Sequence, residues 1–416
     1  MQISIIEFSV QNFKTFKNKV TFSTVAQKND KHTFKDNGEN LLKTSFIYGP
    51  NASGKSTLLE ALIFFKSIVS FSANIQENSM LPYSPFMGNK ENRESPIFFE
   101  LVFSIDGINE GAYRYNFSIM HDRVVSEDLV KISSSGSVKM YISRNEQEIK
   151  IGKEFKDVEM IRDRTRKDTL FLSMAAQFNS TLALNFLEAL KSINIISGII
   201  PGNYQNFTVK KFKEDAVYKE KILEYLRTAD FCISNGRVEE VDVSAVDIKD
   251  GQEGFSATKR VEKGNALFFE HPVYDAKNNR SGSFEILIDA ESEGTKKFLS
   301  ALGPIIDTLD GGKVLFIDEF DNSLHPILTK FIVNLFESKD INKNNAQLIV
   351  TTHDTSLLAN KGEFIKDQFW FTEKDEFGSA KLFSLAEFDI RNDTEFSKKY
   401  LEGRFGALPF IHSTKK

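Results

Sequence analysis

The sequence predicts an α/β fold in which a mixed sheet carries a phosphate-binding loop, and three observations indicate it. The segment GPNASGKST, residues 49–57, stands between an apolar strand-like run and a run of helical period. Two more short apolar runs, KVLFIDE and AQLIVTTHD, end in acidic residues and in histidine. Strand-like runs separated by turn residues fill residues 95–144 and predict an antiparallel β subdomain.

Length and composition set the class of protein. The chain has 416 residues, which exceeds one ordinary core, so two lobes or a domain with a large insertion are expected. Its formal charge of −5 argues against a wholly basic nucleic-acid-binding protein. The single cysteine, Cys232, excludes an intrachain disulfide and a cysteine-based zinc cluster. We find no signal peptide and no apolar run of membrane-spanning length, so we expect a soluble, cytoplasmic protein with no membrane contact.

The order of patterns predicts three parts. Residues 1–180 form a first lobe with an N-terminal β-hairpin around Asn12-Phe13-Lys14, the phosphate loop and the antiparallel sheet. Residues 181–284 alternate helical pieces with short strands and polar loops, and form an inserted helical or mixed lobe. Residues 285–416 form the remaining lobe, with the strands that end in acids and histidine. No heptad repeat is sustained, so a long coiled coil is not expected.

The phosphate loop has the spacing G-x-x-x-x-G-K-S. Gly49 and Gly54 allow the tight turn that points backbone N–H groups at phosphate oxygens, and the helix that follows adds its positive end. Lys55 would reach the β- and γ-phosphates, and Ser56 would bind Mg²⁺. A plain turn with a surface lysine is the alternative, which the complete strand, loop and helix disfavour. The predicted binding residues are Gly49, Pro50, Asn51, Ala52, Ser53, Gly54, Lys55, Ser56 and Thr57.

Three residues at strand ends predict the rest of the phosphate chemistry. Asp318 follows a buried strand and would hold Mg²⁺, and Glu319 beside it would orient or deprotonate the attacking water. His353 follows the next apolar strand and would contact the γ-phosphate or that water. The alternatives are exposed acids at an ordinary strand end and a histidine that caps the next helix. For His325 the sequence leaves three roles open: packing, helix capping and a functional contact.

Two further positions depend on how lobes or subunits meet. Gln177 ends an apolar run and would join two lobes through the metal. In ESEGT, the backbone of Ser292-Glu293-Gly294 leads into a helix, so its N–H groups could bind a phosphate. Because the phosphate loop already serves one side of the nucleotide, this second anion site predicts a head-to-tail dimer that shares two ATP molecules. A plain helix cap is the alternative. A basic cluster at residues 162–167 is expected to be a solvated face.

In this order the motifs resemble the ABC-type head of SMC, RecF and OLD-like ATPases. The resemblance implies a P-loop NTPase that hydrolyses ATP to ADP and phosphate with Mg²⁺, using Lys55, Glu319 and His353 in catalysis. It makes Gln177 the Q-loop residue and a metal ligand beside Ser56 and Asp318. It also assigns a signature at Ser292 and Gly294, a D-loop at Asp321 to Leu324, and the switch histidine at His353.

Two motifs depart from the usual ABC-type pattern and indicate a narrower group. ESEGT stands where transporters carry LSGGQ, and FDNSLHP has His325 where SMC-type heads usually have Asp. Both departures, and the ending YLEGRFGALP, are similar to compact AAA-type ATPases of bacterial phage-defence operons, such as the AriA component of PARIS and the ATPase of AbiL systems. That group implies a homodimer or higher homo-oligomer, a toxic effector partner such as a Toprim-like nuclease, and a phage protein as trigger. A RecF-like repair ATPase that binds DNA and a scaffold that only holds ATP are the alternatives.

Overall fold

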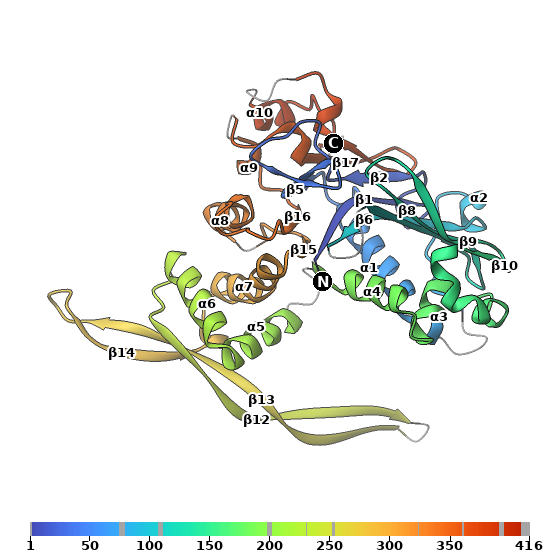
Figure 1. Cartoon of the computed structure of the whole chain (residues 1–416). Helices are drawn as coiled ribbons and strands as arrows, with labels where there is room; N and C mark the ends of the chain where they lie inside the picture. Colours follow the sequence, from blue (N-terminus) through green and yellow to red (C-terminus); the bar gives the residue numbers. More distant parts are fainter. Residues whose placement is uncertain are drawn as a thin grey trace, which may run out of the picture. The chain divides into compact units, whose positions relative to one another are not determined.

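The computed structural model divides the chain into two compact units (Figure 1). It describes residues 2–74, 80–106, 111–197, 202–229, 231–251, 254–322, 324–359, 362–390 and 395–408. The first unit comprises Met1–Ser197, Thr308–Asp321 and Ile332–Lys416. The second unit comprises Gly198–Asp307 and Asn322–Phe331.

A six-stranded sheet forms the centre of the first unit, in the order β11-β15-β16-β5-β17-β18. The strands are β11 (Ile193–Ile196), β15 (Val314–Ile317), β16 (Gln347–Thr351), β5 (Thr44–Tyr48), β17 (Phe369–Lys374) and β18 (Ala380–Ser384). The first five pair in parallel and β18 is antiparallel to β17. Because β15, β16 and β5 run the same way, the residues that follow them meet at one edge of the sheet. The predicted mixed sheet is confirmed.

A seven-stranded antiparallel sheet forms the rest of the first unit, in the order β10-β9-β8-β7-β6-β1-β2. The strands are β1 (Ile3–Gln11), β2 (Val20–Ser23), β6 (Ile97–Ile105), β7 (Ala112–Ile119), β8 (Val124–Ile132), β9 (Val138–Asn145) and β10 (Glu148–Ile151). The predicted N-terminal hairpin is the β1–β2 pair, and Asn12 and Lys14 turn the chain between them with φ of 56° and 48°. A two-stranded ribbon, β3 (Thr33–Asp36) and β4 (Glu39–Leu42), lies in the same unit.

Helix α1 (Lys55–Phe71) packs its apolar face against this antiparallel sheet. The ring of Phe65 lies 5.3 Å from Phe117 and 6.0 Å from Phe8, centroid to centroid. By length and composition alone, residues Lys55–Asn74 could cross a membrane. No run of this length was predicted. Half of that window, 50%, is buried inside the protein. The apolar length of α1 therefore serves a contact with a sheet inside this unit.

The remaining helices of the first unit are short. They are α2 (Lys90–Arg93), α3 (Phe171–Gln177), α4 (Thr181–Lys191), α9 (Ser356–Ala359) and α10 (Phe396–Leu401). Four 3₁₀ helices accompany them: η1 (Ser72–Asn74), η2 (Lys153–Arg164), η4 (Lys366–Gln368) and η5 (Leu385–Glu387). Helix α8 (Pro326–Glu337) begins in the second unit and ends in the first.

The second unit combines helices with a three-stranded sheet of long strands (Figure 1). Its elements are α5 (Gly202–Glu214), α6 (Ala216–Thr228), β12 (Asn235–Gly251), β13 (Gly254–Tyr274), β14 (Arg280–Leu287), η3 (Ile288–Ala290) and α7 (Glu293–Gly311), whose last residues belong to the first unit. The prediction of short strands here is wrong, because β12 and β13 have 17 and 21 residues and pair along the whole of β12. No long coiled coil occurs among the described residues.

The inserted lobe was predicted at residues 181–284, whereas the main part of the second unit is Gly198–Asp307. At the N-terminal boundary, the predicted lobe includes α4 and β11, which the structure places in the first unit. Helix α4 buries Phe186 in the core of the first unit, where its ring meets Tyr113 at 4.8 Å, and β11 pairs in parallel with β15. At the C-terminal boundary, the predicted lobe stops before η3 and most of α7, which the structure places in the second unit after β14.

Candidate nucleotide-binding site

The phosphate loop connects β5 to α1 through two glycines in the left-handed region. Gly49 has φ of 154°, and a Cβ on it would lie 2.3 Å from Oγ1 of Thr372. Gly54 has φ of 114° and precedes α1 without a side-chain cap. The N–H groups of the first helical turn are therefore left for another acceptor, as a phosphate site requires. Non-glycine residues would be strained or would clash at both positions.

Lys55 is a buried cation inside this loop. Its side chain is 6% exposed, and Nζ donates to the carbonyl oxygens of Gly49 at 2.7 Å and Pro50 at 3.1 Å. Burial lowers the pKa of Lys55 from 10.5 to about 8, although the carboxylates of Asp318, Asp321 and Glu319 act in the opposite direction. A phosphate group would supply the negative charge that favours the protonated form. The loop and its lysine therefore fit a nucleotide phosphate.

Two carboxylates follow β15 and differ in exposure. Asp318 is 7% exposed and accepts a hydrogen bond of 2.5 Å from Thr351 Oγ1. Glu319 is exposed, has φ of 49°, and donates its backbone N–H to the same hydroxyl at 2.8 Å. The left-handed backbone of Glu319 turns the chain at this point, so that the side chain of Asp318 is buried and that of Glu319 is exposed. This separation suits one to a metal and the other to proton transfer.

Asp321 holds the end of β16 beside these acids. Its carboxylate accepts from Thr352 Oγ1 at 2.7 Å and from the backbone N–H of His353 at 3.1 Å. Burial and then the charge of Lys55 lower the pKa of His353 below 6.5, against the effect of Asp321, Glu319 and Asp318. The imidazole is therefore neutral at neutral pH and can donate or accept a hydrogen bond. Lys55, Asp318, Glu319, Asp321 and His353 are brought together within the first unit.

Gln177 is not brought to the phosphate loop. It is the last residue of α3, and its Nε2 donates to Oδ1 of Asn74 in η1. Helix α1 has 17 residues, so it separates the loop from η1 by about 25 Å. The prediction that Gln177 joins the lobes through the metal is contradicted by this position, because α3 packs at the far end of α1.

The strand that does end beside Asp318 is β11, which lies within residues 181–284 and was therefore assigned to the inserted lobe. Ile196 pairs with Ile317, and the backbone N–H of Asp318 donates to the carbonyl of Ile196 at 2.8 Å. The β-branched run INII was the signal that could have found this strand. Ser197 follows it, and residues 198–201 lie outside the described part of the chain.

The predicted signature lies in the second unit, at the start of α7. Ser292 Oγ accepts from the backbone N–H of Thr295 at 3.1 Å and lies 2.7 Å from its hydroxyl. This is the geometry of a helix cap. A role for Ser292 and Gly294 across a dimer stays a prediction. His325 likewise caps α8, since its Nδ1 accepts from the N–H of Ile327 at 3.3 Å. In the predicted D-loop, Ser323 lies outside the described residues.

No group of three or more His, Cys, Asp or Glu side chains forms a metal site among the residues that the structure describes. A magnesium ion bound with a nucleotide needs few protein ligands, because phosphates and water supply the others. Ser56, in the first turn of α1, and Asp318 are compatible with that role. The donor set is a hydroxyl and a carboxylate, which Mg²⁺ prefers.

The basic cluster at residues 162–167 is largely ion-paired. Arg162 contacts Asp163, Arg166 contacts Asp168 at 3.0 Å, and Lys167 contacts Asp122 at 3.2 Å. These pairs agree with the expected solvated face.

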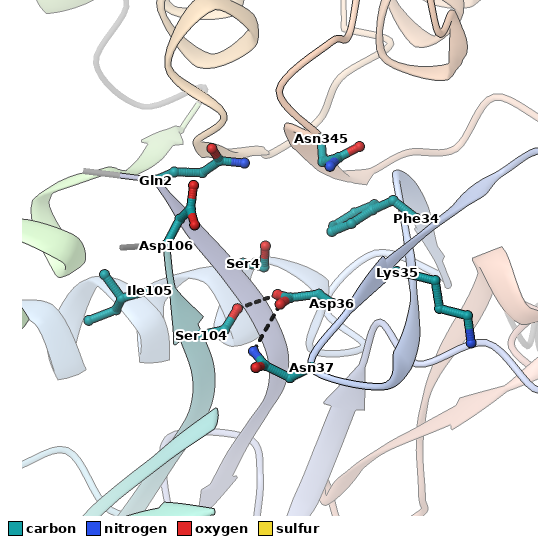
Figure 2. Close-up of a pocket in the computed structure, with 10 residues that line it drawn as sticks. All are labelled: Gln2, Ser4, Phe34, Lys35, Asp36, Asn37, Ser104, Ile105, Asp106 and Asn345. Atoms are coloured by element: carbon teal, nitrogen blue, oxygen red, sulfur yellow. Dashed lines mark hydrogen bonds between the residues drawn. The ribbon is translucent and has the colours of Figure 1, made fainter. Parts of the chain in front are cut away.

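The described residues of the first unit line several pockets, and two of them are compared with the predicted site. One, of about 470 Å³, opens at the phosphate loop and His353. The other, of about 490 Å³, contains none of the predicted site residues. In it Asp36 accepts hydrogen bonds from Ser104 and from Asn37, and the side chain of Lys35 points away from this group (Figure 2).

Comparison with known proteins agrees with this geometry. The family described as "AAA domain, putative AbiEii toxin, Type IV TA system" matches residues 45–359, which include the phosphate loop, Asp318 and His353. No curated protein matches the sequence.

Solved structures of low sequence identity also resemble the chain. The SMC head domain from Thermotoga maritima is 13% identical, with 92% of this chain and 99% of that chain covered and a TM-score of 0.37. The SMC head domain from Pyrococcus furiosus with an extended coiled coil is 15% identical, with 97% and 100% covered and a TM-score of 0.42. The recombination mediator protein RecF is 14% identical, with 92% and 98% covered and a TM-score of 0.36.

Proposed function

The chain belongs to this family of AAA domains and has the fold of a P-loop NTPase of the ABC-ATPase head type, and from that premise we propose that it binds and hydrolyses ATP. The products are ADP and phosphate. One observation carries the proposal. At a single edge of the sheet, a buried lysine in an uncapped glycine loop lies among two strand-end acids and a neutral histidine.

The chain's own residues account for binding. The backbone N–H groups of residues 49–57 hold the phosphates, and Lys55 exchanges its two carbonyl partners for phosphate oxygens. Ser56 and Asp318 would hold Mg²⁺, which supplies positive charge against the phosphate oxygens when bound. The buried position of Asp318 and its bond from Thr351 fix the carboxylate before the nucleotide arrives.

Proton transfer falls to the exposed acid. Glu319 accepts the proton of the water that attacks the terminal phosphate, and its neighbour Asp318 stays buried. His353 donates a hydrogen bond to the terminal phosphate or to that water as a neutral imidazole, and Asp321 fixes its backbone. An assembly that only held ATP would have no need of an exposed acid at this position.

In its cellular role we propose a head-to-tail dimer or higher homo-oligomer that works as the sensor or scaffold subunit of an anti-phage system. Ser292 and Gly294 of one subunit would meet the terminal phosphate bound by the other. The partner is a toxic effector, and a nuclease of Toprim-like fold is the class we expect. The family's description as a toxin of a type IV system supports a defence role. A phage protein would be the trigger.

A calorimetric titration with ATP tests the binding site. The Lys55→Ala variant should lose detectable binding, because the loop loses its only buried ammonium. Lys66→Ala is the matched control. Lys66 lies in the same helix, its pKa is also lowered to about 8 by burial, and its Nζ also donates to a backbone carbonyl, that of Ile193. Equal affinities in the two variants would contradict the assignment of the loop.

The gene beside this one tests the defence role. A gene for a Toprim-like nuclease supports it, whereas a replication or recombination gene supports a RecF-like repair ATPase that binds DNA. The ion-paired basic cluster gives the DNA-binding alternative no support. DNA that stimulates ATP turnover with a steep salt dependence would favour that alternative.

A further inference from the structure

The C-terminal segment, residues 396–408, is not used by the function proposed above. It contains α10 and the described part of the motif YLEGRFGALP, of which Pro409 lies outside the described residues. The segment lines the pocket of about 470 Å³ at the phosphate loop. Gly49, Pro50, His353, Glu373, Tyr400 and Leu408 are among the residues that line it.

Aromatic packing and one hydrogen bond fix the shape of the segment. The ring of Tyr400 stacks on Phe371 of β17 at 5.4 Å, and its hydroxyl donates to the carbonyl of Ala407 at 3.0 Å. Phe405 is buried against Phe371 at 5.8 Å and Phe388 at 5.3 Å. Ala407 is buried and has φ of 54°, which an L-residue adopts only where the surroundings hold it.

The same packing connects the segment to the phosphate loop. Tyr48, the residue before Gly49, is fully buried, and its ring lies 5.9 Å from the ring of Tyr400. Its hydroxyl donates to the carbonyl of Asp354, the residue after His353, at 2.9 Å. A single pair of tyrosines therefore contacts the start of the phosphate loop, the chain at His353 and the C-terminal segment.

The pocket opens at the first residues of the phosphate loop and at His353, which in the proposed function contacts the terminal phosphate. Lys55, which in such loops reaches the β- and γ-phosphates, bonds to the carbonyls of Gly49 and Pro50, and both residues line the pocket. Glu373 also lines the pocket, and a Cβ at Gly406 would lie 3.1 Å from both of its carboxylate oxygens. Glycine at this position lets the segment rest directly on that carboxylate. The segment therefore contacts a carboxylate residue that itself lines the pocket.

We propose that residues 396–408, together with Glu373, form the wall of the nucleotide site that meets the terminal phosphate, so that this segment distinguishes a nucleoside triphosphate from a diphosphate. The proposal rests on the function proposed above. It assigns Leu408 and Glu373 to the wall itself. Tyr400 is a positioning residue, which holds the wall against the strand that carries the loop.

The test compares Leu408→Glu with Leu408→Gln, which have similar volumes and differ in charge. ADP and a non-hydrolysable ATP analogue are titrated calorimetrically, each with Mg²⁺. The new carboxylate should weaken binding of the analogue about tenfold more than binding of ADP, because it acts on the extra phosphate charge across a partly desolvated pocket. The glutamine variant should change both affinities by the same factor. Equal losses for the two nucleotides in Leu408→Glu, or no loss, would overturn the proposal.

A second variant decides the question if Leu408→Glu does not fold. Glu373→Gln removes a negative charge from the wall and should strengthen the analogue relative to ADP by about threefold or more. Glu376→Gln, at an exposed position in the turn that follows, should leave this ratio unchanged. If this ratio is unchanged in Glu373→Gln, the proposed wall is wrong, whereas the proposed ATPase function is unaffected. Failure of the unaltered protein to bind either nucleotide would overturn the proposed function and the wall with it.

Discussion

Raising the pH should weaken ATP binding, because Lys55 loses its proton near pH 8 in the free protein. Its pKa is lowered from 10.5 to about 8 by burial, and nearby carboxylates only partly oppose this. A bound phosphate favours the charged ammonium, so the pKa of Lys55 rises in the complex. The complex then holds more protons than the free protein. The affinity is therefore highest below pH 8 and falls as the pH rises through that value.

The size of the effect follows from that pKa. At pH 8 about half of the free molecules carry a neutral Lys55, so binding should take up about half a proton. At pH 9 only about one molecule in ten is charged, which lowers the affinity about tenfold relative to pH 7. The pKa of His353 is lowered below 6.5, so its ring is already neutral in the free protein over this range.

Calorimetry in two buffers of different ionisation enthalpy measures the proton uptake directly. Lys66→Met is the control, because the pKa of Lys66 is also about 8 and its Nζ bonds to the carbonyl of Ile193 in β11. The control variant should keep the uptake of about half a proton per ATP at pH 8. A flat affinity between about pH 7.5 and 9.5, with no proton uptake, would refute the contact between Lys55 and phosphate.

Three other perturbations separate chemistry, assembly and stability. Glu319→Gln should keep ATP binding and slow phosphate release about 10²-fold or more, as for loss of a general base, and unchanged turnover would remove Glu319 from the mechanism. Mixing Ser292→Ala with Lys55→Ala subunits should restore about half an active site per dimer, and no recovery counts against shared sites. Arg144→Met leaves the carboxylate of Glu127 buried without its cation, so urea unfolding should show a loss of about 3–5 kcal/mol, and a loss below 1 kcal/mol would contradict the pairing.

The residues of the site that could be predicted are those whose positions depend on local sequence. A buried strand followed by glycines and a helix fixes the place of Lys55, whatever the rest of the chain does. Asp318 and His353 follow neighbouring parallel strands, so they share an edge with the loop once the strands pair. The sequence pattern shows the strands and the residues that follow them, whereas the pairing that places these residues side by side is a property of the folded sheet.

Gln177 and β12 were misread because their positions depend on tertiary packing. Gln177 ends a short helix whose place is set by burial of Phe171 and Leu172, whose N–H groups donate to Glu127 on β8. That contact holds α3 away from the phosphate loop. For the stretch that contains β12 the sequence predicted only short strands and polar loops, but the length of a hairpin depends on how far its partner continues to pair. The role of Tyr400 depends likewise on a hydroxyl that meets a carbonyl seven residues later.

The sequence TTHD at the end of β16 explains why the acids of the site are arranged as they are. Thr351 donates to Asp318 and accepts from the backbone N–H of Glu319. Thr352 donates to Asp321, which in turn accepts from the N–H of His353. The left-handed backbone of Glu319 costs roughly 1–2 kcal/mol, and one neutral hydrogen bond contributes about 1 kcal/mol towards offsetting it. Two consecutive threonines at the end of β16 therefore fix three carboxylate residues in the turn after β15, and one of these, Asp321, holds the histidine that follows the threonines.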